Sequence, residues 1–158
     1  KYNYADNTWD IGSLSRTAWV DFGLHDKPRA AGVAEGFNYI YSHETGTTND
    51  GDAMEPFIES SVFSIGDGEQ FSFISRLIPD IDISSSDATT SVNYVLKSRN
   101  FPGESLTTNS TSAITSTTDQ AFVRSRSRSS VLRVESSASD VQWTLGDLRL
   151  DIRPDGRR

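Results

Sequence analysis

The sequence predicts an all-β protein, and three observations support this prediction. Apolar and polar residues alternate along several short runs, which is the two-residue period of a strand with one buried face. Clusters of Gly, Pro, Asn, Asp and Ser separate these runs at intervals of roughly 8–12 residues, a spacing typical of sandwiches and barrels. No long stretch repeats apolar residues at helical spacing without an interruption by Gly, Pro or a Ser/Thr cluster.

Residues 1–50 form the first predicted region, a closing blade-like β segment. Trp9 and Trp19 lie on either side of a short apolar run, and glycines interrupt short strands that end in the aromatic run at 37–41. Four short strands in roughly 45 residues is the size of one propeller blade, which cannot cover both of its own faces. We therefore expect other sequence to bury the aromatic residues of this region. The chain begins with Lys1 in an apparent strand and without a signal-peptide pattern, so we expect it to be a piece of a longer protein.

A polar stretch at residues 46–52 contains no apolar residue and marks the predicted boundary. After it, residues 53–158 are expected to form a C-terminal antiparallel β-sandwich domain, because short alternating strands follow one another with polar turns between them. The Gly-Asp-Gly sequence at 66–68 predicts a hairpin between the apolar runs on either side of it. Polar residues predict a loop at 84–87, and residues 107–118 are expected to be a loop or a Thr-rich edge strand.

Alternation along three further runs identifies the expected core of this domain. Apolar residues occupy even positions at 92–96, odd positions at 141–145 and even positions at 148–152. The change of parity at Gly146 and Asp147 predicts a bulge or a tight turn, since a one-residue slip moves every later side chain to the other face. The side chains expected in the core are Phe63, Phe71, Phe73, Ile78, Val92, Tyr94, Leu96, Phe122, Leu132, Val134, Val141, Trp143, Leu145 and Leu150.

Composition and charge exclude several classes of protein. The chain has 158 residues, no cysteine and a formal net charge of −7. The absence of cysteine excludes Cys-ligated zinc, iron–sulfur clusters, disulfide scaffolds and thiol catalysis. No apolar run is long enough to cross a bilayer, so no membrane span is expected. Residues 1–96 carry 5 basic and 15 acidic residues, whereas residues 97–158 carry 10 and 7, too weak a basic surplus for a nucleic-acid-binding surface.

The sequence gives little support for catalysis, and we expect no catalytic, cofactor-binding or metal-binding residues. Two carboxylates on one strand face are the groups that cleave a glycosidic bond, but such pairs also occur by chance in an acidic chain. The candidate pairs are Glu55 with Glu59, Asp80 with Asp82, and Asp147 with Asp151. The two histidines, His25 and His43, lack partners at metal-ligand spacing. The loop from Asn49 to Asp52 carries oxygen ligands suited to calcium, but its residues are also those of an ordinary turn.

Three arginines form a predicted stripe on one face of a strand. Arg124, Arg126 and Arg128 alternate with serines between two apolar pairs. One interpretation is contact with carboxylates of a neighbouring subunit, to which guanidinium groups bind in a bidentate manner. The other interpretation is a solvated hairpin end, where three like charges cost little. The first interpretation makes these arginines candidate subunit-interface residues, together with Trp9 and Trp19.

Several strings of the sequence are distinctive. They are NTWDIG at 7–12, RTAWVD at 16–21, YSHETG at 41–46, IGDGEQFSFI at 65–74, LIPD at 77–80, KSRNFPG at 97–103, LRVES at 132–136, WTLG at 143–146 and LDIRPDGRR at 150–158. With these strings the chain resembles the C-terminal part of the tail nozzle (tail tubular protein B-like) structural proteins of short-tailed bacteriophages, almost from end to end.

The resemblance implies a non-enzymatic structural role in the virion. Subunits of this family form a ring, commonly of six copies, below an adaptor ring and around the DNA exit channel. The implied partners are therefore copies of the chain itself and other tail proteins such as the adaptor, while DNA passes without sequence-specific binding. A negative net charge suits this passage, because walls rich in Lys and Arg would bind the DNA backbone.

Two other functions remain open from the sequence. A receptor- or carbohydrate-binding β-module of a phage tail would need Trp9, Trp19 and Trp143 on its surface. A glycan-cleaving tail enzyme would need a cleft with paired carboxylates. We expect Trp143 to be in the core, because Val141 and Leu145 share its parity.

Overall fold

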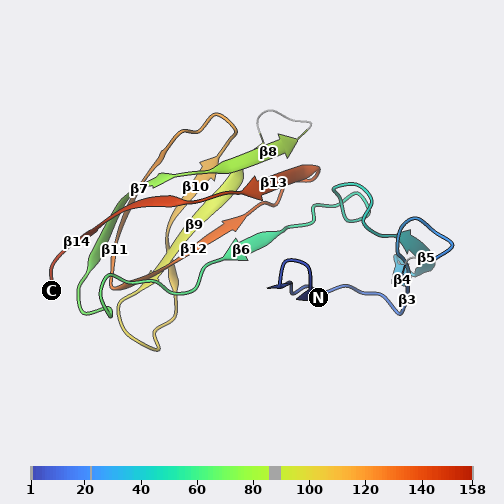
Figure 1. Cartoon of the computed structure of the whole chain (residues 1–158), viewed down its shortest axis with the longest axis horizontal. Coiled ribbons are helices and arrows are strands. Elements are labelled where there is room, and N and C mark those ends of the chain that lie inside the picture. Colours follow the sequence, from blue (N-terminus) through green and yellow to red (C-terminus); the bar gives the residue numbers. More distant parts are fainter. Residues whose placement is uncertain (1, 22, 86–89, 158) are drawn as a thin grey trace. The chain divides into compact units, whose positions relative to one another are not determined.

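The computed structural model describes residues 2–21, 23–85 and 90–157. These residues contain strands and no helix, and every strand pairing among them is antiparallel. The prediction of an all-β protein with antiparallel sheets is therefore confirmed. The chain divides into two compact units, Lys1–Gly46 (unit 1) and Thr47–Arg158 (unit 2), whose strands are labelled in Figure 1.

Unit 1 contains a small sheet and a separate short ladder. The ladder pairs β1 (Tyr2–Asn3) with β2 (Thr8–Trp9). The sheet has the order β3-β4-β5, with β3 at Ala18–Val20, β4 at Arg29–Ala34 and β5 at Phe37–Ser42. Its β4–β5 turn consists of Glu35 and Gly36, both with positive φ, which is the geometry of a tight two-residue hairpin. The sheet thus has three strands, whereas the sequence predicted four in one blade.

The described residues of unit 2 form three sheets. The first has the order β10-β9-β12-β6, the second β11-β7-β14, and the third pairs β13 with β8. The strands of unit 2 are β6 (Phe57–Glu59), β7 (Ser72–Ile78), β8 (Ile81–Ser85), β9 (Val92–Arg99), β10 (Thr107–Ile114), β11 (Ala121–Ser127), β12 (Ser129–Glu135), β13 (Val141–Leu145) and β14 (Arg149–Pro154).

One continuous core connects the four-stranded and the three-stranded sheets. Its members come from β7, β9, β10, β11 and β12, and each loses nearly all of its solvent exposure. Burying each large aliphatic side chain stabilises the fold by about 1.5–3 kcal/mol. The core residues are Ile74, Leu77, Val92, Tyr94, Leu96, Ile114, Val123, Leu132 and Val134.

At Gly146 and Asp147, where the sequence predicted a bulge or a tight turn, the structure has a break between two strands of different sheets. β13 pairs with β8 and β14 pairs with β7, so the interruption between β13 and β14 lies opposite Pro79 and Asp80. The Asp80 carbonyl accepts a hydrogen bond from the Gly146 N–H at 2.8 Å, and its carboxylate accepts one from the Asp147 N–H at 3.0 Å. A Cβ at position 146 would lie 2.5 Å from Asp80 Oδ2, so glycine lets the two interruptions meet.

The predicted hairpin at residues 66–68 is wrong. The turn exists, with positive φ at Gly66 and Gly68. However, β6 before it pairs with β12, and β7 after it pairs with β11 and β14, so the chain crosses from one sheet to another. Of the run before the turn, only Phe63 makes a bridge, to Ser130. A glycine-rich turn is compatible with a crossing between sheets and also with a hairpin, because both use residues with left-handed backbone.

Two further predictions were tested at polar segments. Residues 107–114 form β10 at the edge of the four-stranded sheet, so the edge-strand interpretation is confirmed there. A bulge interrupts β10 between Thr108 and Ser110, and the Asn109 amide donates to Ser125 Oγ at 2.8 Å. The loop expected at 84–87 was wrong at its start, because β8 extends to Ser85, while residues 86 and 87 lie outside the described residues.

Phe122 is the clearest error in the predicted core, since 75% of its surface is exposed. It shares the outward face of β11 with Arg124 and Arg126, while Val123, Ser125 and Ser127 face inward. Strand geometry cannot bury Phe122 while its arginine neighbours of the same parity remain in water. The other half-buried members of the expected core are Phe63, Phe71, Phe73, Ile78, Trp143, Leu145 and Leu150.

Candidate functional site

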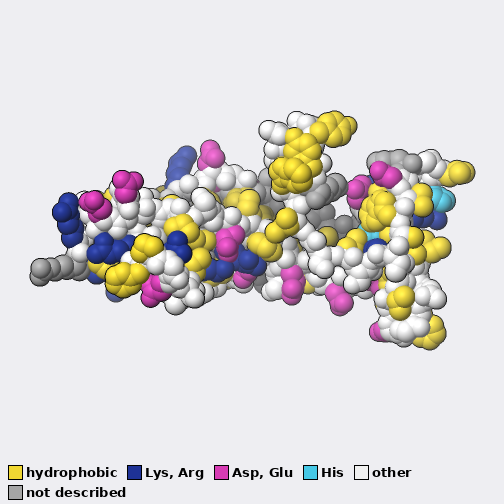
Figure 2. All heavy atoms as spheres, turned by 90° about the horizontal axis from the view of Figure 1, so that it is seen from below, with side chains coloured by type: hydrophobic (Ala, Val, Ile, Leu, Met, Phe, Trp, Pro, Cys, Tyr) yellow, Lys and Arg dark blue, Asp and Glu magenta, His cyan; other side chains and the backbone are white. Residues whose placement is uncertain are grey.

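Unit 1 exposes most of the large apolar side chains of its three-stranded sheet. Phe37 is 66% exposed and Ile40 76% exposed on β5, and Trp19 is 50% exposed on β3. Figure 2 shows hydrophobic side chains at the surface of this unit. Exposed apolar side chains lie on both faces of the sheet, with Trp19, Phe37 and Tyr39 on one face and Val20, Val33 and Ile40 on the other. We call these six residues together the aromatic sheet surface.

The large side chains of this sheet are exposed because the buried positions of its central strand hold only small residues. On β4 the buried positions are Ala30 and Gly32, which cannot form a core by themselves. On β5, Phe37 and Tyr39 point to one face and Ile40 to the other, yet all three are exposed. Both faces of β5 therefore lack cover within the described part of unit 1.

A cation–π contact and a tilted ring contact hold Arg16, Tyr41 and His43 close to Trp19. The Arg16 guanidinium lies 3.8 Å from the centre of the Tyr41 ring, and its Nε donates to His43 Nε2 at 3.4 Å. The His43 ring in turn lies 4.6 Å from the ring of Trp19. His43 is thus half-buried in a contact network, consistent with a structural role for this side chain.

Trp9 belongs to the β1–β2 ladder and is 77% exposed. Its ring lies 4.7 Å from the ring of Tyr2, whose hydroxyl donates to Asn7. Trp9 and Trp19 are therefore both accessible, as an interface or a ligand-binding surface would require. Trp143 is different, because it is half-buried against the core of unit 2 and donates from Nε1 to Ser136 Oγ at 3.1 Å.

Arg124 and Arg126 of the predicted stripe lie on β11, and Arg128 follows the end of this strand. Arg126 and Arg128 contact the C-terminal segment of unit 2. Arg126 pairs through Nε with Asp155 Oδ2 at 2.5 Å and also donates to the Asp155 carbonyl at 3.0 Å. Arg128 donates to the carbonyls of Gly68 and Glu69, and to that of Arg157 at 3.0 Å. Two of the three predicted interface arginines thus have partners within their own chain.

Both arginines make cation–π contacts with the ring of Phe71. The guanidinium groups of Arg126 and Arg128 lie 4.0 and 4.6 Å from the centre of its ring. The Phe71 backbone also accepts from the Asp155 N–H at 2.7 Å and donates to the Gly156 carbonyl at 2.8 Å. We call Phe71, Arg126, Arg128 and Asp155 the C-terminal clamp.

Arg124 is the member of the stripe that remains available. Its side chain is exposed on the outward face of β11, and it has no hydrogen-bond or ion-pair partner among the described residues. The interface role of the stripe stays a prediction. A substitution of Arg124 therefore tests the interface role without disturbing the C-terminal clamp.

Half of the six candidate carboxylates make structural contacts. Glu59 accepts a hydrogen bond from Lys97 Nζ at 2.7 Å, and Arg133 lies 3.6 Å from the same oxygen. The hydrogen bond from Lys97 is the main reason that the pKa of Glu59 is lowered, against the opposing effect of desolvation. Asp151 pairs with Arg76 at 2.6 Å. Asp80 accepts the backbone hydrogen bonds at the β13–β14 break described above, so three of the six carboxylates have identified structural partners.

The loop from Asn49 to Asp52 forms a tight turn. The backbone N–H groups of Asn49 and Asp52 donate to each other's carbonyls at 2.9 and 3.1 Å. Asp50 and Gly51 between them have positive φ, as a type I′ turn requires. Turn geometry therefore accounts for this composition. In the described ranges 2–21, 23–85 and 90–157, no group of three or more His, Cys, Asp or Glu side chains is placed to hold a metal ion.

Sequence reasoning missed two notable side chains. Phe71 was expected in the core, yet its ring carries the clamp, because pairing of β11 with β7 brings the arginines to it. Tyr94 is fully buried, and its hydroxyl has no hydrogen-bond partner among the described residues. Burial, with a smaller contribution from the charge of Asp80, raises the pKa of Tyr94 to about 12.

No protein-family model matches the chain, and no curated protein matches it with a significant score. The part of the chain that the structure describes contains no helix long and apolar enough to span a membrane.

Proposed function

We propose that the chain is a structural component of the virion tail of a short-tailed bacteriophage, a nozzle subunit in the ring that lines or supports the DNA exit channel. Its partners are other copies of the chain and neighbouring tail proteins such as the adaptor. The observation that carries this proposal is the aromatic sheet surface, since the described residues of unit 1 bury no large apolar side chain of this sheet fully. A sheet exposed in this way needs a partner in an assembly.

Within this proposal, unit 2 is a C-terminal β-sandwich. The support is that residues from the four-stranded and three-stranded sheets share one core. Sandwiches bury the inner faces of two sheets in this manner and need no catalytic cleft. Unit 1 is then a blade-like segment, whose three-stranded sheet is completed by strands from other sequence.

The arrangement of charges is also compatible with a channel component. Lys97, Arg76 and Arg126 each contact a carboxylate of their own chain. Basic groups neutralised in this way bind DNA phosphates less strongly, because the release of counterions that drives such binding is reduced. The net charge of −7 further opposes adhesion of DNA.

The test is the state of the purified 158-residue chain. We expect ring-shaped or higher-order assemblies in negative-stain electron microscopy and native mass spectrometry, and slow exchange of β3–β5 amides only in the assembled form. Gold-labelled antibodies against the chain should mark the tail of the parent virion. A well-ordered monomer with residues 1–50 protected from hydrogen exchange would overturn the proposal.

The arginine stripe allows a sharper test of the assembly. Arg124→Glu should weaken association of subunits, because it reverses an exposed charge that has no partner among the described residues. Its fold should remain intact, as measured by circular dichroism. Reversal of Arg126 and Arg128 is a poor substitute, since both stabilise the C-terminal clamp. Unchanged assembly of Arg124→Glu would remove the stripe from the proposed interface.

A second candidate function is favoured by the exposure of Trp9 and Trp19. Exposed aromatic rings are what a receptor- or carbohydrate-binding module of a tail needs, although half-buried Trp143 does not fit the complete set expected for it. Glycan-array binding that is lost in Trp19→Ala, with the chain monomeric throughout, would favour this function over the nozzle.

A further inference from the structure

The outer face of the three-stranded sheet in unit 2 gathers arginine side chains. Ile74 and Leu77 of β7 point into the core, so the residues next to them point outward. Arg126 of β11 and Arg153 of β14 are both paired with Phe73, and residues paired across a ladder share a face. The outward arginines of β11 and β14, which we call the arginine face, are Arg124, Arg126, Arg149 and Arg153.

Most of these arginines have no charged partner in the part of the chain that the structure describes. Arg124, Arg149 and Arg153 are exposed and make no ion pair or hydrogen bond with a described residue. The Arg153 guanidinium lies 4.9 Å from the centre of the Phe73 ring, a contact that holds it against the sheet without using its N–H donors. Phe122, on the same face, is 75% exposed. The arginine face therefore offers positive charge together with an apolar contact.

A short exposed segment of unit 2 carries the opposite charge. Residues 50–55, which we call the acidic segment, contain Asp50, Asp52 and Glu55 and no basic residue. These three side chains are exposed, and they form no ion pair with another described residue. Met54 of the same segment is 62% exposed. The acidic segment is thus complementary to the arginine face in both its charge and its apolar side chain.

The two surfaces lie on different parts of unit 2. The acidic segment leads into β6, which belongs to the four-stranded sheet. The arginine face is the outer face of the three-stranded sheet, and the core that the two sheets share lies on the opposite side of that sheet. A partner for either surface therefore has to come from another molecule.

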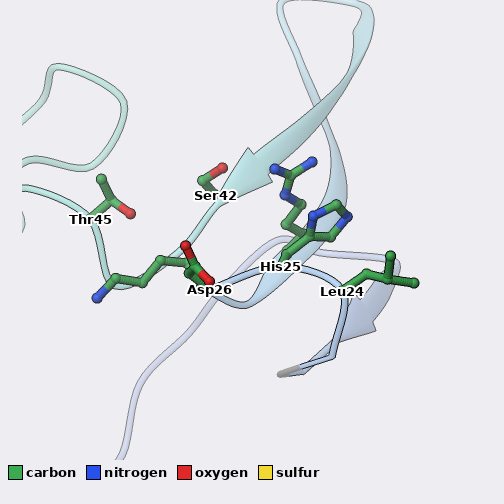
Figure 3. Close-up of a pocket in the computed structure, with 7 residues that line it drawn as sticks. Leu24, His25, Asp26, Ser42 and Thr45 are labelled. Atoms are coloured by element: carbon green, nitrogen blue, oxygen red, sulfur yellow. The ribbon is translucent and has the colours of Figure 1, made fainter.

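The described part of unit 1 has no comparable basic surface. Two of its basic residues, Lys27 and Arg29, line one pocket together with Asp26. Figure 3 shows the two basic side chains of this pocket extending to opposite sides of it. Because their charges are not directed at one place, an acidic partner fits the arginine face better.

We propose that the arginine face binds the acidic segment of a second copy of the chain. Guanidinium groups bind carboxylates through paired N–H donors, and Met54 packs against Phe122 beside them. Because the two surfaces differ, the contact is head-to-tail and repeats from one copy to the next, which produces a ring where the rotation closes. This inference rests on the proposed assembly of copies and names the two surfaces that form it.

A nucleic acid matches the arginine face less well than a second copy does. Guanidinium groups already occupy the rings of Phe71 and Phe73, on which unpaired bases would have to stack. The net charge of −7 also repels a polyanion, whereas the acidic segment brings its carboxylates to the face on a chain that is present in every copy.

The experiment measures self-association of the full chain by sedimentation equilibrium at low ionic strength. The face-reversal variant is Arg124→Glu with Arg149→Glu, and both arginines lack a partner among the described residues. The segment-reversal variant is Asp52→Lys with Glu55→Lys. It retains Asp50, whose left-handed backbone favours Asp over most other residues.

Each variant alone should self-associate about tenfold more weakly than the parent chain, because exposed ion pairs are replaced by like charges. Added salt should reduce this difference. An equimolar mixture of the two variants should associate like the parent chain, since the negative face of one variant then meets the positive segment of the other. This rescue separates loss of the contact from loss of folding, because a misfolded variant would not be rescued.

The matched control is Asp26→Lys with Asp82→Lys, which changes the net charge by the same amount as the segment reversal. Both carboxylates are exposed, and Figure 3 shows Asp26 on the loop before β4, outside both proposed surfaces. The control should associate like the parent chain.

Several outcomes would overturn the proposed contact. Unchanged self-association in either reversal variant, absence of rescue in the mixture, or equal weakening in the control would each do so and leave the nozzle proposal in place. Binding of a short duplex DNA that is lost only in the face-reversal variant, with self-association unchanged by segment reversal, would assign the arginine face to nucleic acid. A parent chain that stays monomeric at every concentration would overturn both proposals. Rescue in the mixture without antibody labelling of a virion tail would support the contact and overturn the nozzle.

Discussion

Units 1 and 2 both consist of short antiparallel strands, but they differ in whether the large apolar side chains of these strands are buried. In unit 2, alternate side chains of β9 and β12 meet in a core where Leu96, Val92 and Val134 are fully or almost fully buried. In unit 1, the buried positions of β4 are an alanine and a glycine, while the large side chains of β5 face solvent. The two units therefore differ in where the large side chains lie rather than in whether strands form.

This difference shows that hairpin geometry and a core are separate requirements. The β4–β5 hairpin of unit 1 has the correct turn residues and a regular register over six pairs. Small sheets are marginally stable unless an apolar face is covered. The described part of unit 1 therefore has a regular hairpin backbone without a covered apolar face.

The largest expected difference in stability is between two truncations, one in the core of unit 2 and one on the sheet of unit 1. Leu96→Ala should lower the free energy of unfolding of unit 2 by about 2–5 kcal/mol, because it leaves a cavity in a closed core. Ile40→Ala should change the stability of the dissociated chain by less than about 0.5 kcal/mol, since its side chain is 76% exposed. Urea unfolding followed by tryptophan fluorescence measures both. Equal effects would mean that unit 1 has a core comparable to that of unit 2.

A smaller effect is expected at the C-terminal clamp. Arg128→Ala removes three hydrogen bonds to backbone carbonyls and one contact with Phe71. We expect a loss of about 1–2 kcal/mol in the unfolding free energy of unit 2, reduced by partial solvent exposure. Hydrogen exchange should increase at Asp155, whose N–H bonds to the Phe71 carbonyl. Arg124→Ala is the matched control, and a similar loss in it would argue against a specific clamp.

Tyr94→Phe tests the one buried polar atom of the core that has no partner among the described residues. At neutral pH we expect an unchanged or higher stability, by up to about 1 kcal/mol, since the variant removes an unsatisfied hydroxyl. Burial raises the pKa of Tyr94 from 10 to about 12, so the folded state holds the phenol proton more tightly than the unfolded state does. The effect of this shift on the unfolding free energy is therefore absent below pH 10, and stability is lost as the pH rises from 10 toward 12. The alkaline decrease in unfolding free energy should therefore be smaller in Tyr94→Phe. Tyr4→Phe, at an exposed position, is the matched control and should leave the free energy of unfolding unchanged.

The smallest effect is expected for Glu59→Gln. The pKa of Glu59 is lowered in the folded state, so its contribution to stability is present above pH 4.5 and disappears as the pH falls through the folded value. The pair with Lys97 is partly exposed, and we expect a loss below about 1 kcal/mol at neutral pH. Unfolding curves of parent and variant should converge in acid. A constant difference between pH 3 and 7 would show that the effect is not due to this charge.

Periodicity alone was sufficient to find strands whose two faces have different surroundings. Residues 92–96 and 141–145 lie in β9 and β13, because one face of each packs against the core and the other does not. The same rule placed Phe122 wrongly. Its apolar character argued for burial, whereas Arg124 and Arg126 of the same parity required solvent. Charged side chains are the stronger constraint when both share a face.

The partners of strands and side chains could not be predicted from local sequence. The turn at 66–68 is compatible with a hairpin and with a crossing between sheets, and long-range pairing with β12 and β11 determines which one forms. The clamp depends on the same pairing, since Arg126 reaches Phe71 only through the β11–β7 register. The arginine stripe was visible in the sequence, but the carboxylate and carbonyls that Arg126 and Arg128 use were not.

The bulge at Asn109 bears on the solubility of the chain. β10 has eight residues at the edge of its sheet, and it contains no proline and no charged residue. A long uncharged edge offers its free N–H and C=O groups to any extended chain and invites edge-to-edge aggregation. The bulge breaks the regular spacing of these groups, and the bond from Asn109 to buried Ser125 holds the break in place. A single amide anchored between two strands thus takes the place of the charges that usually protect such an edge.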